Sequence, residues 1–158
     1  MAEFHITREY PHRPETLWRA LTDPDLVPQW TATGRGGRPE GFAAEVGRHF
    51  RYVGKPLPGW NGIVACEVLA VEPPVMLQHT WQGDKQEPSL VTWRIQPAGT
   101  GPDGGSRLTY DHTGLRGVDG FIMATFVLGP IRRRMLTTGL PPVLDAIDGA
   151  VRPGPPRG

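Results

Sequence analysis

Residues 6–30 read ITREYPHRPETLWRALTDPDLVPQW, and a strand runs into the start of this stretch. Phe4, Ile6 and Tyr10 share one side of an alternation of apolar and polar side chains over residues 3–10. An alternation with a period of two predicts a half-buried strand. Two prolines follow and end the strand, so the stretch begins the fold with a strand and not with a helix.

Two short helices are predicted in the remainder of the stretch. Pro14 suits the first turn of a helix, where a missing N–H group costs nothing. Leu17, Trp18 and Leu21 then form an apolar stripe at helical spacing. Asp23 is a candidate N-cap for a second short helix over residues 25–30.

The middle of the chain predicts a long loop and then a meander of antiparallel strands. Residues 31–47 are rich in Gly, Arg and Pro and show little periodicity, which is typical of a loop. Five segments with strand patterns follow, at residues 48–53, 63–71, 76–82, 90–96 and 107–113. Residues 99–104 spell a GxGxxG motif, but a strand follows it where a nucleotide site needs a helix. We interpret the motif as a hairpin turn.

Helical patterning returns from Gly117, and a final helix is predicted from Pro130 to about Ala150. Its apolar stripe consists of Ile131, Met135, Leu140, Leu144 and Ile147. Pro141 and Pro142 interrupt this helix, which predicts a kink or a brief break. Three consecutive arginines at 132–134 fan across about 200° of helix surface, as expected of a solvated face.

These elements predict an α+β fold, in which a curved antiparallel sheet of about six strands is covered by the long C-terminal helix. We expect a single domain over residues 1–151 and a disordered Pro/Gly-rich tail over residues 152–158.

Composition excludes several classes of protein. The 158 residues carry 17 Lys plus Arg against 16 Asp plus Glu, a balance that argues against nucleic acid or an anionic membrane as the partner. No apolar run approaches the roughly 20 residues of a membrane span, and no signal peptide is evident, so we expect a cytoplasmic protein. The single cysteine, Cys66, and the five histidines show no metal-ligand spacing. No metal or cofactor is expected.

Five segments in chain order resemble the START-like (SRPBCC) superfamily, in particular its branch of activator-of-heat-shock-protein-ATPase homologues. They are ITREYPHRPETLWRALTDPDLVPQW, VGRHFRY, EVLAVEPPVMLQHTW, SRLTYDHTGL and GLPPVLDAI. Val46 stands where the family pattern has Gly, and Leu140 stands at the usual Trp. The resemblance implies a helix-grip fold with a hydrophobic cavity. It does not imply one activity, because similar proteins include lipid carriers, polyketide aromatase/cyclases, co-chaperone domains and the antibiotic self-resistance proteins of enediyne producers.

The candidate site lies on the inward face of the predicted sheet. Its aromatic side chains are Trp30, Phe50, Tyr52, Trp81, Trp93 and Tyr110, which either line a ligand cavity or fill the core. His79 and His112 point inward among them, as acid–base groups or as hydrogen-bonded parts of the wall. Met123 and Met135 could line the same cavity from the helical side.

The leading hypothesis is a non-enzymatic module that binds or sequesters a hydrophobic or aromatic small molecule, in natural-product self-resistance or in a stress response. It requires open room between the rings and the helix that starts near Pro130. One alternative is a polyketide aromatase/cyclase-like enzyme that uses His79 or His112. The other is a co-chaperone-like protein-binding module. A monomer is favoured, although the sequence leaves the oligomeric state open.

Overall fold

Most of the chain forms one sheet and the helices beneath it. The computed structural model describes residues 2–32, 37–56, 58, 61–83, 87–99, 104–115 and 129–151. The strands are β1 (Ala2–Tyr10), β2 (Arg38–Glu40), β3 (His49–Val53), β4 (Ile63–Glu72), β5 (Met76–Gly83), β6 (Ser89–Ala98) and β7 (Gly105–Leu115). The described helices are α1 (Pro14–Thr22), α2 (Val27–Thr31), α4 (Gly129–Arg134) and α5 (Leu140–Val151), and a π-helical turn over Met135–Gly139 joins α4 to α5.

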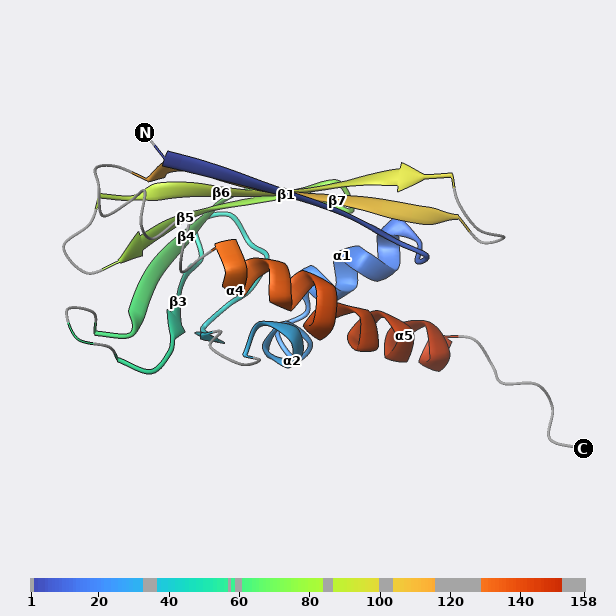
Figure 1. The fold of residues 1–158 in the computed structure, drawn as a ribbon, viewed down its shortest axis with the longest axis horizontal. Helices are drawn as coiled ribbons and strands as arrows, with labels where there is room; N and C mark the ends of the chain where they lie inside the picture. The colour runs from blue at the N-terminus through green and yellow to red at the C-terminus, as the bar shows by residue number, and fades with distance from the viewer. Residues whose placement is uncertain are drawn as a thin grey trace, which may run out of the picture.

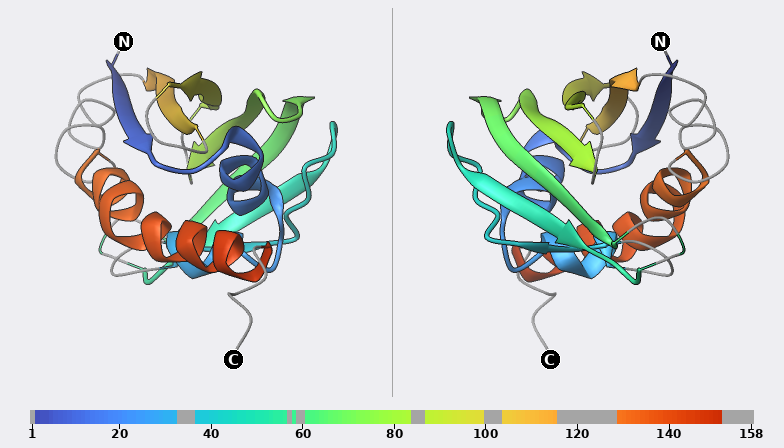
Figure 2. Two further views of the ribbon diagram at one scale, coloured as in Figure 1. Left: turned by 90° about the vertical axis from the view of Figure 1, so that its right-hand side faces the viewer. Right: turned by 90° about the vertical axis from the view of Figure 1, so that its left-hand side faces the viewer.

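All seven strands belong to one antiparallel sheet, in the order β1-β7-β6-β5-β4-β3-β2. The first strand pairs with the last, so that Ile6 lies opposite Tyr110. The chain then passes through α1 and α2 to the other edge and returns strand by strand. Figure 1 shows the α4–α5 segment below the sheet, and Figure 2 shows the sheet bent around the helices. The predicted α+β helix-grip fold is confirmed.

The seventh strand, β2, lies inside the segment that we predicted as a loop. It pairs with β3, with Arg38 opposite Val53 and Glu40 opposite Arg51. The Glu40 carboxylate and the Arg51 guanidinium form an ion pair of 3.0 Å across the two strands. Three residues are too few to show an alternating pattern, so no local signal predicts this strand.

The helices α1 and α2 begin for different reasons. Pro14 starts α1, and Leu17 and Leu21 are buried, as predicted. Asp23 does not cap α2, because that helix begins only at Val27. The Asp23 carboxylate instead accepts a hydrogen bond of 2.9 Å from the Asp25 N–H group in the turn between the helices.

The C-terminal helix is continuous through Pro141 and Pro142, so the predicted break there is wrong. The π-helical turn comes directly before the two prolines, and the Leu140 N–H group bonds to the carbonyl of Met135, five residues earlier. A wider turn places the preceding carbonyls away from the proline rings, which would clash with them in an α-helix.

This geometry frees the Leu136 carbonyl, which receives a partner from another element. The Leu140 N–H group is already bonded to Met135, and Pro141 has no N–H group to donate. The Tyr10 hydroxyl donates a hydrogen bond of 2.6 Å to the Leu136 oxygen. The end of β1 thereby fixes the helix at its irregular turn.

A second set of polar contacts holds α5 to the corner between β1 and α1. The His12 ring lies between two carboxylates, with Nδ1 2.5 Å from Asp148 Oδ2 and Nε2 3.0 Å from Asp145 Oδ1. Thr16 Oγ1 donates to the other Asp148 oxygen at 2.7 Å.

Of the helices in the described residues, none is long and apolar enough to cross a membrane.

We predict that Tyr10→Phe lowers the free energy of unfolding by about 1–3 kcal/mol, because it leaves the buried Leu136 carbonyl without a donor. The measurement is urea unfolding followed by circular dichroism. The same substitution should cost clearly less in a Pro141→Ala background, where the restored N–H group lets the helix satisfy its own carbonyls. Equal costs in the two backgrounds would contradict this explanation of the bond.

Candidate functional site

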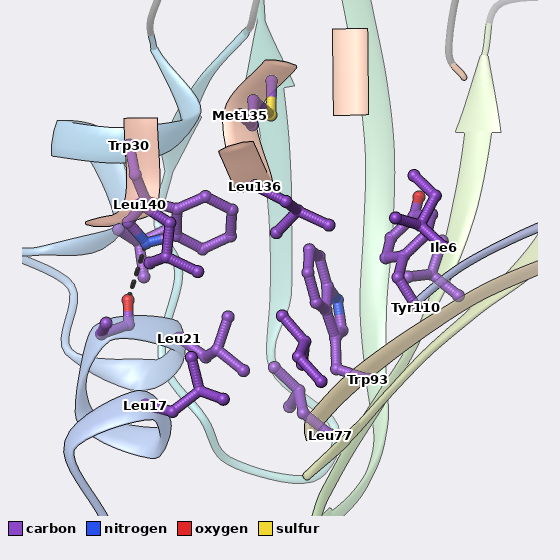
Figure 3. Close-up of a cluster of buried hydrophobic side chains, with 14 of the residues drawn as sticks. Ile6, Leu17, Leu21, Trp30, Leu77, Trp93, Tyr110, Met135, Leu136 and Leu140 are labelled. Carbon is purple, nitrogen blue, oxygen red and sulfur yellow. Dashed lines mark hydrogen bonds between the residues drawn. The ribbon is translucent and has the colours of Figure 1, made fainter. Parts of the chain in front are cut away.

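Nine of the ten predicted site residues are buried in the interior between the sheet and the helices. They are Trp30, Phe50, Tyr52, His79, Trp81, Trp93, Tyr110, His112 and Met135. The tenth, Met123, lies outside the described residues. Figure 3 shows part of this interior, with Trp93 and Tyr110 facing Leu136 and Leu140 of the helical segment.

The aromatic residues form a circuit on the concave face. In order around it the rings are Trp93, Tyr110, His112, Trp81, Tyr52 and Phe50, with neighbouring centroids 4.5–6.3 Å apart. Trp30 packs on Trp93 at 5.6 Å from outside the circuit. His79 closes the circuit, since its ring lies 5.3 Å from Phe50 and its Nε2 accepts the Trp93 indole N–H at 3.2 Å. Most of these pairs are edge-to-face, the arrangement that the ring quadrupoles favour.

His79 uses both of its ring nitrogens inside the protein. Nδ1 donates to the Thr80 carbonyl at 2.9 Å, and Nε2 is the acceptor for Trp93. Burial lowers the pKa of His79 to about 4, so the ring is neutral at pH 7. A neutral imidazole with both nitrogens engaged has no free lone pair for a substrate proton. This geometry fits a wall residue better than a general base.

His112 is the second neutral imidazole. Ser89 Oγ donates to the Trp81 carbonyl at 3.0 Å and therefore accepts from His112 Nε2 at 2.8 Å. His112 Nδ1 has only a long contact of 3.4 Å with the Tyr110 hydroxyl. Burial, and then the charge of Arg132, lower the pKa of His112 to about 3. Gly114 has a φ of 85°, which favours glycine, and it lies close to Ser89.

A small cavity lies beside the circuit. Its volume is about 10 Å³, which is room for one water molecule. Leu21 and Val27 line it from the helices, and Leu77 and Trp93 line it from the sheet. This volume is far below the open space that the sequence analysis required. In the part of the chain that the structure describes, the large inward rings touch one another and leave little room.

Sequence reasoning missed Phe42, which also lines this cavity. Phe42 lies outside the strands, between β2 and β3, and packs edge-to-face on Phe50 at 5.0 Å. The signal available was an isolated aromatic residue in the Gly-, Arg- and Pro-rich segment.

Arg132 is the second residue that we missed, and it corrects the prediction of a solvated arginine face. Arg133 and Arg134 are exposed, but Arg132 is only 2% exposed. Its guanidinium carbon lies 5.4, 4.8 and 5.6 Å from the ring centroids of Tyr52, Trp81 and Tyr110. The helix phase could have indicated this, since position 132 is four residues before Leu136 and eight before Leu140, both of them buried.

The surroundings of Arg132 compensate its charge only in part. Removing a charged group from water costs several kcal/mol even after the protein relaxes. Each aromatic face returns about 0.5–2 kcal/mol through cation–π attraction. Nη1 contacts the Met135 sulfur at 3.3 Å, and Nε has no hydrogen-bond partner within the described ranges. Arg132 is therefore a buried cation with unused donor capacity.

The remaining ionisable groups of the site carry no negative charge at pH 7. Burial raises the pKa of the Cys66 thiol to about 12 and also raises the pKa values of Tyr52 and Tyr110. Asp111 lies on the outer face of β7 and pairs with His5. Among the described residues, no cluster of three or more His, Cys, Asp or Glu side chains could hold a metal ion.

We predict that His79 makes folding stability depend on pH. Its pKa in the folded protein, about 4, lies below the ordinary value of 6.5, so the unfolded chain takes up the proton first as the pH falls. The free energy of unfolding contributed by this group should fall by about 2 kcal/mol between pH 7 and pH 5. Urea unfolding of the wild type and of His79→Gln at both pH values measures it, and the variant should lose this share of the decrease.

Imidazole nitrogen NMR provides the internal control for this prediction. His79 and His112 should remain neutral from pH 8 to pH 5. His5 should take up its proton at a higher pH than an ordinary histidine, because its hydrogen bond with Asp111 raises its pKa. An equal loss of stability in the wild type and in His79→Gln would show that His79 is not held neutral by burial.

Known proteins with the same fold match this chain over most of its length. The family of activator of Hsp90 ATPase homolog 1-like proteins matches residues 11–129. A search of curated proteins finds no match. Protein MLL2253 from Mesorhizobium loti is 28% identical, with a TM-score of 0.68, covering 92% of this chain and 98% of that one.

Two further solved structures share the fold at lower identity. PFC0360w, an HSP90 activator from Plasmodium falciparum, is 20% identical with a TM-score of 0.59, over 93% of this chain and 96% of its own. DynU16, a putative protein in the dynemicin biosynthetic locus, is 22% identical with a TM-score of 0.57, over 87% of this chain and 48% of its own. The matched residues include the strands and short helices that build the candidate site, and the chain belongs to the family of activator of Hsp90 ATPase homolog 1-like proteins.

Proposed function

We propose that this protein binds an apolar or aromatic small molecule between the concave face of its sheet and the α4–α5 segment. The observation that carries the proposal is the circuit of rings, of which Tyr52, His79 and Trp93 line a small cavity. The hydrogen bonds of His79 support binding over catalysis, because they leave that ring no nitrogen for proton transfer.

The small size of the cavity implies that a guest enters by displacing protein side chains. Phe42 is the best candidate for displacement, since it lines the cavity from outside the strands. Its contact with Phe50 is a single edge-to-face pair, worth about 0.5–1.5 kcal/mol beyond the burial of area. Outward movement of Phe42 would give a guest the space that this ring now fills, and binding would then select a more open state.

The energy available from such a guest is large enough for useful affinity. Burying about 250 Å² of apolar ligand surface contributes about 6 kcal/mol at 25 cal/mol per Å², before the costs of association. Opening the site reduces this gain by the lost ring contacts. A gain of about 6 kcal/mol corresponds to a dissociation constant of about 40 μM, so we expect small aromatic probes to bind no more tightly than tens of micromolar.

For the natural ligand we propose a polyketide-type aromatic natural product, and for the role its sequestration in self-resistance. A role in a stress response would use the same binding. The support from DynU16 is the shared fold, because its identity to this chain is only 22%. Aromatic polyketides are therefore the first compounds to test against the generic probe.

We predict that the wild type binds N-phenyl-1-naphthylamine, a neutral probe whose emission rises in apolar surroundings. Leu77→Phe adds bulk to the cavity wall and should weaken this binding by about tenfold or more. Val46→Ser serves as the control, since Val46 is 68% exposed and should not touch the guest. Fluorescence titration at pH 7 measures all three dissociation constants, and aromatic polyketides should displace the probe.

Thermal unfolding of each variant verifies that it is folded at the temperature of the titration. The proposal fails if the probe does not brighten when the wild type is added at up to several hundred micromolar, well above the expected dissociation constant of tens of micromolar. It also fails if a folded Leu77→Phe variant binds as tightly as the wild type, since the guest would then lie elsewhere.

A further inference from the structure

Arg132 brings a positive charge into the interior without a negative partner from the described part of the chain. In the ion pairs found there, the carboxylates pair with Arg19, Arg48, Arg51, Arg107 and three histidines. The groups that do surround Arg132 are phenols, an indole, a thiol and imidazoles, all uncharged at pH 7. A charge left in this state is costly unless something else neutralises it.

The free donor has the geometry of a recognition group. A guanidinium is a planar fork, and its Nε–H and one terminal N–H group can grip the two oxygens of a carboxylate side by side. Nε is the atom that has no hydrogen-bond partner among the described residues. Tyr52 lines the cavity and also lies against the guanidinium, 5.4 Å from its carbon, so a guest that enlarges the cavity past Tyr52 would meet the fork.

The position of Arg132 on the helix is also fixed. It lies in the last turn of α4, directly before the π-helical turn, and Tyr10 bonds to that turn at Leu136. The guanidinium is therefore presented by a segment whose rotation relative to the sheet is set by an independent contact. A donor that is held in place before binding favours a ligand with a negatively charged group at the matching position.

We infer that Arg132 binds an anionic oxygen group of the guest, so that the ligand is an aromatic acid or an acidic enol and not a neutral aromatic compound. The inference rests on the proposed function and names the ligand class for the same interior. The acid group would pair with Nε–H and a terminal N–H of Arg132, and the aromatic body would lie against the rings.

The test compares 2-naphthoate with its methyl ester, which has the same aromatic body without the charge. Isothermal titration calorimetry at pH 7 should show that the wild type binds the carboxylate at least about tenfold more tightly than the ester. Arg132→Met should lose this preference while it keeps its affinity for the ester within about twofold. Arg132→Lys keeps the charge but not the fork, and should retain part of the preference.

Arg133→Met is the matched control, since it removes a neighbouring arginine that is exposed. It should leave both affinities unchanged. The inference is overturned if the wild type binds the two probes equally, or if folded Arg132→Met retains the preference for the carboxylate. If either variant of Arg132 fails to fold, the comparison of the carboxylate with the ester on the wild type still tests the inference. If neither probe binds and N-phenyl-1-naphthylamine also fails, the proposed function itself is wrong. If the neutral probes bind without a preference for charge, only the choice of an acidic ligand is wrong.

Discussion

The contact between the C-terminal helix and the concave face of the sheet governs the rest of this structure. The sheet supplies a wall of rings, and the helix supplies Leu136, Leu140 and Leu144, all of them fully buried. The same helix face carries Arg132 inward, so apolar packing and the burial of a charge are consequences of one helix rotation. The π-helical turn and the Tyr10–Leu136 hydrogen bond set that rotation.

The interior at this contact differs from an ordinary core in how its buried polar groups are satisfied. In an ordinary core, buried polar groups satisfy one another, and here His79, Ser89 and the Trp30 and Trp93 indoles do so. Arg132 departs from this rule, because its Nε is the one buried side-chain atom among the described residues that lacks a partner. A protein selected for stability alone would gain from an apolar side chain at this position. Retention of a guanidinium among rings is better explained by a partner that arrives from outside.

Most of the fold followed from local patterns in the sequence. Alternation placed Tyr52, Trp81, Trp93 and Tyr110 on one face, because the side chains of a strand alternate strictly between its two sides. The helix stripe of Met135, Leu140, Leu144 and Ile147 is buried as predicted, and Ile131 is half-buried. The strand β2 could not be predicted, because three residues carry no period.

The site was predicted less completely, for reasons of packing. A pattern assigns a face to each ring but not the distances between rings, so the small volume of the cavity was not foreseeable. The three adjacent arginines were predicted to face solvent, since charged residues are seldom buried. The phase that Arg132 shares with Leu136 and Leu140 was a contrary signal, and it proved the stronger one. Proline rules predicted a kink or a brief break at Pro141 and Pro142, and after the π-helical turn the helix continues without a break.

The most direct test of the account is the ¹⁵N NMR signal of the Arg132 Nε–H group, assigned by its loss in Arg132→Lys. In the free protein this proton should exchange slowly with water, because Nε is buried. Saturation with 2-naphthoate should shift the Nε–H proton downfield, as a charge-assisted hydrogen bond forms, and the methyl ester should leave it nearly unchanged. An Nε–H signal that stays in place while other interior signals move on binding of the carboxylate would contradict the account.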